Sequence, residues 1–457
     1  MRRQRGARAA SVGGLKRLRA NVAGVDLGAR EHWVCGPERD DGQPNVQTFR
    51  TTTPELERLL RWLQQQGVVS VAMESTSVYW IPLYELLEAN GIEVVLVNAR
   101  HLSGVPGRKT DMLDCQWLQT LHSCGLLKGS FRPDESICQL RALQRERANL
   151  VAERTRIVQR MQKALDQMNV QVHHAVTDLT GKTGLSIVRA IVAGERTPNT
   201  LAKLRDHRCR KSEAQIAEHL SGNWRDEHLF NLKMGVRRYD EINLIIIEYD
   251  AQLGRWLAAL QPPERQGQTA PPHPNAAKEK AIAARGERAR RDALWRLAGV
   301  DLTRIDGISA AAAEIVLTEV GLDLTKFPDE RHFISWLRLS PKLSISAGKP
   351  VPKRTKGTGA TRVAGVLRMA ALALAHSETA LGAYSRRIAR RKGGAVAIFA
   401  TARKLAALIF RMLRYGQDYV DEGVAAYEAR FQQRRLHQLV ETARQLGYQL
   451  VPALEAA

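Results

Sequence analysis

The chain has 457 residues, enough for two or three domains that each bury a core. Lys and Arg number 69 against 47 Asp and Glu, and the resulting net charge of +22 favours nucleic acid as a partner. Five scattered cysteines without a C-x-x-C pair exclude a zinc knuckle and indicate reduced thiols. No apolar run approaches the roughly 18 residues that span a bilayer, so we expect a cytoplasmic protein with no membrane contact.

The first 127 residues predict a basic arm followed by an α/β domain. Residues 1–20 are basic and small, which is typical of a disordered arm that either touches phosphates or has no role. Over residues 21–127 strands and helices alternate. Strands are expected at Val22–Asp26, His32–Cys35, Val46–Arg50, Val68–Glu74 and Ile92–Val97, and helices at Pro54–Gln66, Ile81–Asn90 and Asp111–Cys124. This element order is that of a ribonuclease H-like domain.

Four carboxylates fall at the ends of these elements. Asp26 closes the first strand and Glu74 the fourth, while Asp111 and Asp114 lie three residues apart on one helical face. Each alone is an ordinary turn or cap residue. Together, in a basic chain, they predict a site for two Mg²⁺ ions, with Mn²⁺ as a substitute. Four nearby basic residues are expected to hold the nucleic-acid backbone, namely Arg100, His101, Arg108 and Lys109.

Residues 133–260 predict an all-α arm. Asp134 is the expected N-cap of a long helix whose apolar residues recur at sevens and eights beneath a basic outer face. This pattern fits a coiled-coil seam between two copies and an intramolecular helical hairpin equally well. Further helices are expected over Leu201–Leu220 and Glu227–Leu260. Residues 261–291 are rich in Pro and then charged, which predicts a linker or insertion that orders only in part.

Residues 292–423 predict a mainly α-helical C-terminal domain, followed by a helical tail over 424–457. The stretch before the apolar run Ala310–Val320 has the shape of a helix-hairpin-helix, in which Gly307 presents backbone N–H groups to a phosphate. A later loop offers Ser346 as a candidate nucleophile and Ser344 as a second candidate, because cations around them can neutralise a phosphodiester. These cations, with one at the start of the next helix, are Lys349, Lys353, Arg354, Lys356 and Arg362.

Together these motifs resemble the transposases of the IS110 family, in particular its IS1111-like branch. The resemblance runs from Asn21 to about Gly423. It rests on Gly24-Val-Asp26, Glu74-Ser-Thr, Lys109-Thr-Asp111-x-x-Asp114, Ile305-x-Gly307, the spacing from Pro341 to Ser346, and Arg403-Lys-Leu. The chain departs from the family pattern in three places: Ala347 separates the serine from Gly348, the usual Arg-Gly-Asn reads Thr358-Gly359-Ala360, and the linker after Gln261 is longer.

The resemblance carries expectations for fold, site and partners. It implies a bacterial protein in which a coiled-coil arm joins a RuvC-like domain to a transposase domain. The metal acids would be Asp26, Glu74, Asp111 and Asp114, and the nucleophile Ser346. It also implies a structured guide RNA from the element, which pairs with donor and target DNA. From the seam pattern of the arm we expect assembly into a dimer or tetramer.

The sequence therefore predicts a DNA transposase that cuts and rejoins strands through a phosphoserine bond. An alternative is a metal-dependent nuclease of the Holliday-junction type, which would use the acids alone. A third interpretation is a degenerate element protein that binds nucleic acid without cutting it. A covalent bond between protein and DNA distinguishes the first from the other two.

Overall fold

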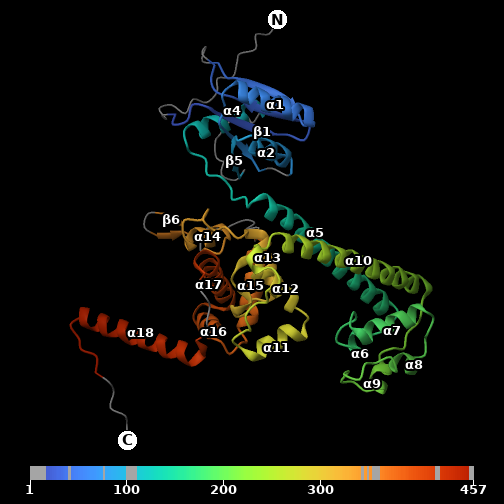
Figure 1. The fold of residues 1–457 in the computed structure, drawn as a ribbon. Helices are drawn as coiled ribbons and strands as arrows, with labels where there is room; N and C mark the ends of the chain where they lie inside the picture. The colour runs from blue at the N-terminus through green and yellow to red at the C-terminus, as the bar shows by residue number, and fades with distance from the viewer. Residues whose placement is uncertain are drawn as a thin grey trace. The chain divides into compact units, whose positions relative to one another are not determined.

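The chain forms two compact units, 1–132 and 133–457, called here the N-terminal and C-terminal units (Figure 1). The structure is a computed structural model and describes residues 17–39, 43–75, 78–98, 111–340, 344–346, 349–351, 361–416 and 422–451. The N-terminal unit is built on a five-stranded sheet and the C-terminal unit is mostly helical. This agrees with the expected combination of an α/β part and an α-helical part.

The strands of the N-terminal unit form one mixed sheet in the order β3-β2-β1-β4-β5. Antiparallel pairs join β1 to β2 and β2 to β3, whereas β1 to β4 and β4 to β5 are parallel. All five strands lie within two residues of their predicted bounds. They are β1 (Val22–Leu27), β2 (Glu31–Cys35), β3 (Val46–Arg50), β4 (Ser70–Glu74) and β5 (Glu93–Val97).

One face of this sheet is covered by α1 (Thr53–Gln65) and α2 (Trp80–Ala89). Successive residues of a strand face opposite sides, so alternate apolar residues of β1 and β4 enter this layer. The buried core on this side includes Ala23, Val25, Val71, Met73, Leu59, Leu63, Leu83 and Leu87. The leucines come from the apolar stripes that the sequence predicted for the two helices.

The opposite face is covered by α4 (Asp111–Ser123), which packs across β1, β2 and β4. Gly24 in β1 faces this helix. A Cβ atom on Gly24 would lie 2.3 Å from the backbone nitrogen of Gln119 and 2.4 Å from the carbonyl oxygen of Cys115. The absence of a side chain at this position therefore lets the backbone of α4 lie directly on the sheet.

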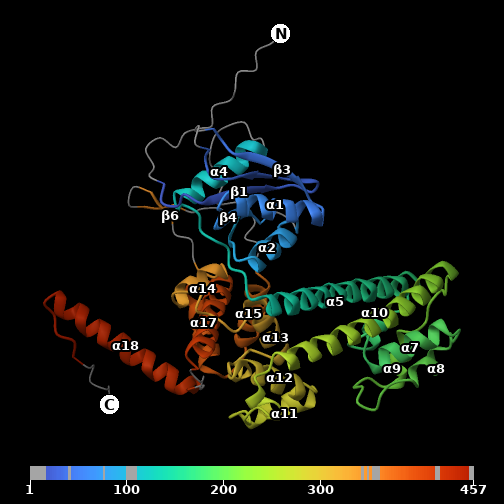
Figure 2. The same cartoon turned by 45° about the horizontal axis from the view of Figure 1, so that its top comes forward.

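The C-terminal unit begins with two long helices, α5 (Glu135–Gln167) and α10 (Asp226–Ala259), which lie side by side in both ribbon views (Figures 1 and 2). Asp134 is the N-cap of α5, as predicted. Four short helices fill the far end of this hairpin, namely α6 (Val172–Ala175), α7 (Lys182–Val192), α8 (Pro198–Ala202) and α9 (Glu213–Glu218).

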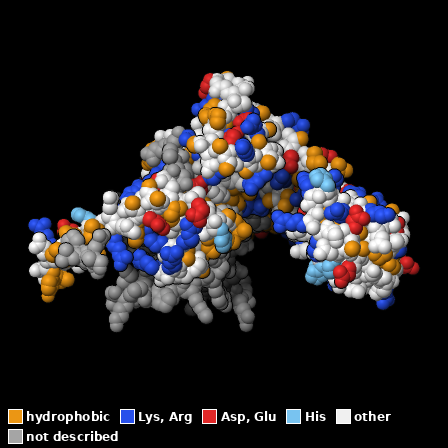
Figure 3. Space-filling model, turned by 90° about the horizontal axis from the view of Figure 1, so that it is seen from below, with side chains coloured by type: hydrophobic (Ala, Val, Ile, Leu, Met, Phe, Trp, Pro, Cys, Tyr) orange, Lys and Arg blue, Asp and Glu red, His pale blue; other side chains and the backbone are white. Residues whose placement is uncertain are grey.

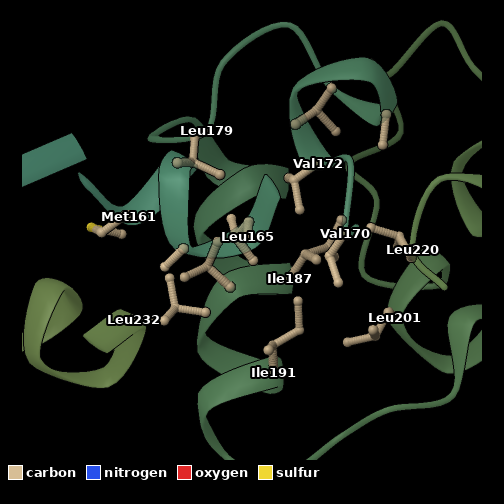
Figure 4. Packing of buried hydrophobic residues seen from close by; sticks show 14 of the residues in the cluster. Met161, Leu165, Val170, Val172, Leu179, Ile187, Ile191, Leu201, Leu220 and Leu232 are labelled. Carbon is tan, nitrogen blue, oxygen red and sulfur yellow. The ribbon is translucent and has the colours of Figure 1, made fainter. Parts of the chain in front are cut away.

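An apolar core joins these short helices to the hairpin (Figure 4). It contains the predicted seam residues Ile157, Met161, Leu165 and Met168, together with Ile187 and Leu232 from neighbouring helices. These four seam residues are thus buried inside the chain. Their burial within one chain agrees with the intramolecular helical hairpin, the second of the two predicted alternatives.

The prediction of one helix over Leu201–Leu220 is wrong. Only α8 and α9 form there, because local hydrogen bonds between side chain and backbone compete with helix formation. The Asp206 carboxylate accepts the N–H of Arg208 at 3.1 Å, and Ser212 makes a capping box with Gln215 that starts a new helix.

Residues 261–291 are folded rather than linker-like. They contain η1 (Pro263–Arg265), α11 (Ala276–Ala284) and the start of α12 (Arg288–Ala298). Arg291 is only 2% exposed, and its guanidinium lies 2.7 Å from the Asp301 carboxylate and 3.1 Å from that of Glu279. Charges that suggested a solvated linker are therefore paired in the interior.

The remaining elements are η2 (Leu302–Arg304), α13 (Ala310–Val320), α14 (Glu330–Trp336), β6 (Ser344–Ser346), β7 (Lys349–Val351), α15 (Arg362–Leu374), α16 (Ala380–Lys392), α17 (Gly394–Tyr415) and α18 (Gly423–Gln445). Helices α14, α15 and α16 pack on α17, α13 packs on α15, α18 packs on α16, and β6 pairs with β7. Among the helices that the structure describes, none is both long enough and apolar enough to cross a membrane.

Candidate active site

Two predicted acids lie at the ends of neighbouring strands. β1 and β4 are parallel, with Val22 opposite Ser70 and Val25 opposite Met73. Continued by one residue, this register brings Asp26 level with Glu74, on strands about 4.8 Å apart. Strand alternation puts both residues on the α4 face of the sheet, and both are partly buried.

The direction of α4 brings its first turn to the same edge. His122 near the end of α4 hydrogen-bonds through Nε2 to the Ser70 hydroxyl at the start of β4, at 2.8 Å. The carbonyl of Cys115, nearer the start of α4, lies over Gly24. The helix therefore runs opposite to β1 and β4, and its first turn reaches the strand ends. Asp114 lies in that turn and is partly buried.

The electrostatics of the first turn agree with this placement. Burial, followed by the neighbouring Cys35 thiol and then the Asp26 carboxylate, raises the pKa of the Cys115 thiol. The Asp26 carboxylate therefore lies close enough to act on Cys115, the residue next to Asp114. Asp111 is the first residue of α4, and its side chain lies outside the described residues.

The acids at this edge are chemically suited to a divalent cation. Carboxylate oxygens are the hard ligands that Mg²⁺ prefers, and like charges that gather at one edge repel each other unless a cation lies between them. Within the described ranges, however, no group of three or more His, Cys, Asp or Glu side chains is arranged to hold a metal ion. The side chain of the fourth acid, Asp111, lies outside the described residues.

The candidate serines belong to a two-stranded ribbon of the C-terminal unit. β6 and β7 pair antiparallel, with Ser346 opposite Lys349 and Ser344 opposite Val351. Ser346 therefore occupies the last paired position before the connection between the strands. The predicted basic residues Arg100, His101, Arg108, Lys109, Lys353, Arg354 and Lys356 lie outside the described residues.

Gly307 and Arg362 lie at the two ends of the packing between α13 and α15. Gly307 is exposed in the turn between η2 and α13 and has a φ of +84°. A Cβ atom on it would lie 2.9 Å from the Leu374 side chain of α15, so the turn requires glycine for its conformation and for its packing. Arg362 is the first residue of α15, and its Nε lies 3.8 Å from a carboxylate oxygen of Glu319 in α13.

Glu319 was not singled out in the sequence. Its side chain is 8% exposed and accepts two hydrogen bonds from the Arg145 guanidinium, at 2.8 and 2.7 Å. Arg141 lies 3.4 Å from the same carboxylate. Glu319 thereby joins α5 of the arm to α13 and to the start of α15. The only sign of this role in the sequence is a Glu within the apolar run 310–320. Its partners Arg145 and Arg141 lie 174 and 178 positions away, so the sequence did not indicate them.

Two family models match the chain, and both describe the same class of protein. Residues 23–170 match a model for the DEDD transposases of IS110, described as a transposase, and residues 301–386 match a model for the transposases of the IS116/IS110/IS902 family. The chain is therefore a transposase, and as such it binds DNA.

The two matched segments together span just over half of the 457 residues. The protein belongs to the IS110 family of transposases, as its motifs predicted. The first segment contains all four predicted acids, and the second contains Gly307, Ser346 and Arg362. No curated protein matches the chain.

Proposed function

We propose that this transposase cuts and rejoins DNA with Ser346 as nucleophile and with a metal site at Asp26, Glu74, Asp111 and Asp114. The observation that carries the proposal is the strand register. It brings Asp26 and Glu74 to one edge of the sheet, where α4 begins with the other two acids. The strand order β3-β2-β1-β4-β5, with its first three strands antiparallel, supports a ribonuclease H-like, RuvC-like fold for the N-terminal unit.

The four carboxylates would hold two Mg²⁺ ions, or Mn²⁺ in their place. When bound, such ions neutralise charge on a phosphodiester and stabilise the oxygens that enter and leave phosphorus. The protein itself would contribute by holding the four acids in place. The sheet fixes Asp26 and Glu74 through backbone pairing, and α4 fixes the other two through its packing on Gly24.

Ser346 would exchange one phosphate ester for another. Its hydroxyl oxygen attacks the DNA phosphorus, the bond from phosphorus to the DNA oxygen breaks, and the serine proton ends on the released DNA hydroxyl. A hydroxyl of a second strand then attacks the phosphoserine and releases the serine. One ester is broken for each ester formed, so rejoining needs no ATP.

Basic residues of both units would bind the DNA backbone, namely Arg108, Lys109, Lys349, Lys353, Arg354, Lys356 and Arg362, with Gly307 offering its N–H. A guide RNA from the element would pair with donor and target DNA. Assembly into a dimer or tetramer through a coiled coil is supported by α10, which leaves Phe230, Leu244 and Ile247 exposed by 62%, 63% and 62%. Their spacings of 14 and 3 residues fit a heptad pattern.

A nuclease of the Holliday-junction type remains the second candidate. All four acids belong to the N-terminal unit, so a cutting site that uses the acids alone needs no serine. The nuclease would direct a water molecule at phosphorus and leave no protein on the DNA. The two functions therefore differ in one observable product.

A suicide DNA substrate separates them. A nick near the cleavage point lets the strand needed for the return reaction diffuse away, so the covalent intermediate accumulates. We expect the adduct with wild-type protein and with Ser344→Ala, and none with Ser346→Ala. If Ser346→Ala cuts at the wild-type rate and wild-type protein leaves no adduct, the serine function is wrong and the nuclease function replaces it.

A further inference from the structure

The C-terminal helix α18 meets α16 and α17 at a junction that no motif had marked. Tyr427 of α18 is buried against Ala380 and Ala383 of α16, with Tyr384 and Val424 packed beside it. Beyond this contact α18 is largely exposed. Helices α17 and α18 lie outside both segments that match the family models, whereas the second segment, which ends at residue 386, includes the first half of α16.

Two cations face the aromatic rings of this junction. The guanidinium carbon of Arg387 lies 3.7 Å from the centre of the Phe431 ring and 4.9 Å from that of Tyr427. The Lys404 ammonium lies 4.8 Å from the Tyr384 ring and 5.6 Å from Tyr427. Among the described residues, neither cation forms an ion pair with a carboxylate.

Further positive charge surrounds Lys404. Burial, followed by the charges of Arg387, Arg430, Arg434 and Arg411 in that order, lowers the pKa of Lys404. Two of these arginines have acidic partners, since Arg430 pairs with Glu422, and Arg411 pairs with Glu330 at 2.8 Å. The guanidinium of Arg434 donates only to the backbone carbonyl of Arg430 among the described groups, at 3.4 Å. The junction thus holds an excess of positive charge in the folded state.

A buried hydroxyl at the centre of the junction lacks an acceptor. Tyr427 is 5% exposed, and no acceptor lies within hydrogen-bond distance of its hydroxyl among the described residues, since the neighbouring Arg387 guanidinium can only donate. Burial is the main cause that raises the pKa of Tyr427, so the hydroxyl keeps its proton and remains a donor. Buried donors in folded proteins are normally satisfied. An anion that accepts from Tyr427 and lies against Arg387 and Lys404 would satisfy both the hydroxyl and the excess charge.

We propose that the junction of α16, α17 and α18 binds a phosphodiester of nucleic acid. Arg387, Lys404 and Arg434 would neutralise the phosphate, the Tyr427 hydroxyl would donate to it, and the rings of Tyr384 and Phe431 offer faces of the kind on which bases stack. The protein binds DNA, and Lys and Arg gather in patches on the face drawn in Figure 3, so nucleic acid is the polyanion expected here. The proposal rests on neither the metal site nor Ser346.

The test measures binding without catalysis. The full-length chain is titrated in EDTA against a labelled DNA duplex and, separately, a labelled single-stranded RNA, over a series of salt concentrations. The variant is Lys404→Gln with Arg434→Gln. Each lost phosphate contact lowers the slope of log affinity against log salt by about 0.9 on duplex DNA and about 0.7 on a single strand. We therefore expect a loss of up to about 1.8 with DNA or about 1.4 with RNA, and the polymer that shows the loss is the one bound here.

Two further variants control for charge and for folding. Arg444→Gln removes one charge about 15 Å further along α18, so its slope should stay close to wild type. Tyr427→Phe keeps the ring and removes the hydroxyl, and should weaken binding about ten- to a hundredfold, as expected for one hydrogen bond to a charged group. Slopes unchanged in the double variant for both polymers, or lowered equally by Arg444→Gln, would overturn the proposal. Wild-type affinity in Tyr427→Phe would remove the hydroxyl from the site.

Discussion

The two units hold their candidate catalytic residues in different ways. In the N-terminal unit, Asp26 and Glu74 end neighbouring strands of a sheet that is covered on both faces. In the C-terminal unit, Ser346 lies on a strand of three residues paired with one other, and helices elsewhere in the unit are joined by ion pairs such as that of Glu319. Backbone register fixes the positions of Asp26 and Glu74, whereas side-chain charges join the helices of the C-terminal unit. Replacing the Asp26 carboxylate should therefore leave the stability of the fold unchanged. Replacing the Glu319 carboxylate of the C-terminal unit should lower it.

The largest effect is expected at Asp26. Asp26→Asn keeps the shape of the side chain but removes the charge of a proposed metal ligand, so strand exchange in Mg²⁺ should fall by about 10³-fold. The urea midpoint should stay unchanged because the strand pairing is unaffected. Glu57→Gln, on the exposed face of α1, is the matched control and should keep full activity. Wild-type exchange by Asp26→Asn would show that this edge is not the metal site.

Gly24 tests whether the backbone of α4 must lie on the sheet. Gly24→Ala places a carbon 2.3 Å from the Gln119 nitrogen, so α4 has to shift, at a cost of about 3 kcal/mol in unfolding free energy. Strand exchange should fall as well, since α4 carries two of the acids. Gly254→Ala in α10 is the opposite control. Nothing lies within 4 Å of the added carbon, and alanine favours the helix by about 1 kcal/mol. Equal stability of the two variants would contradict the close packing.

Glu319 tests whether buried ion pairs stabilise the C-terminal unit. Glu319→Gln leaves the Arg141 and Arg145 charges without their carboxylate and should cost about 2 to 3 kcal/mol, because breaking a mostly buried ion pair leaves an uncompensated charge. Glu330→Gln breaks the exposed pair with Arg411 and should cost less than about 1 kcal/mol. Urea unfolding of the two variants measures the difference. A loss at Glu319 as small as that at Glu330 would mean that buried charges do not support this unit.

His32 gives the N-terminal unit a dependence on pH. The side chain is 1% exposed, and burial lowers its pKa to about 4, against 6.5 in the unfolded chain. As the pH falls below 6.5 the unfolded chain takes up a proton that the folded chain does not, so stability present above pH 6.5 is lost. The loss between pH 7 and pH 5 should be about 2 kcal/mol. In His32→Leu, urea unfolding should lack this part of the pH dependence, and an unchanged dependence would place the titration elsewhere.

The N-terminal unit was predictable because its signals are local. Each strand has its own apolar run, and α1 shows an apolar stripe of leucines, so element bounds were right to within two residues. The end of a strand is also visible in sequence, which is why Asp26 and Glu74 were candidates. The contact of Gly24 with α4 was not, since it depends on a helix about 90 residues later in the chain.

In the C-terminal unit the sequence was less informative. Hydrogen bonds from backbone N–H groups to the side chains of Asp206 and Ser212 compete with the helix that was predicted there, and two short helices form instead. The charges of residues 261–291 suggested a linker because Asp301, the buried partner of Arg291, lies outside that segment. The phosphate site proposed at Arg387, Lys404 and Tyr427 comes from three helices. The sequence shows only that each of these helices contains basic and aromatic residues.

The most direct test of the account is to find which atom of the protein carries the DNA. The adduct from the suicide substrate is digested with nuclease and trypsin, and the peptide Leu343–Lys353, which contains both candidate serines, is fragmented in a mass spectrometer. We expect a nucleotide bound through phosphate to Ser346, with Ser344 unmodified. An unmodified peptide from a reaction in which the DNA was cut would contradict the serine mechanism.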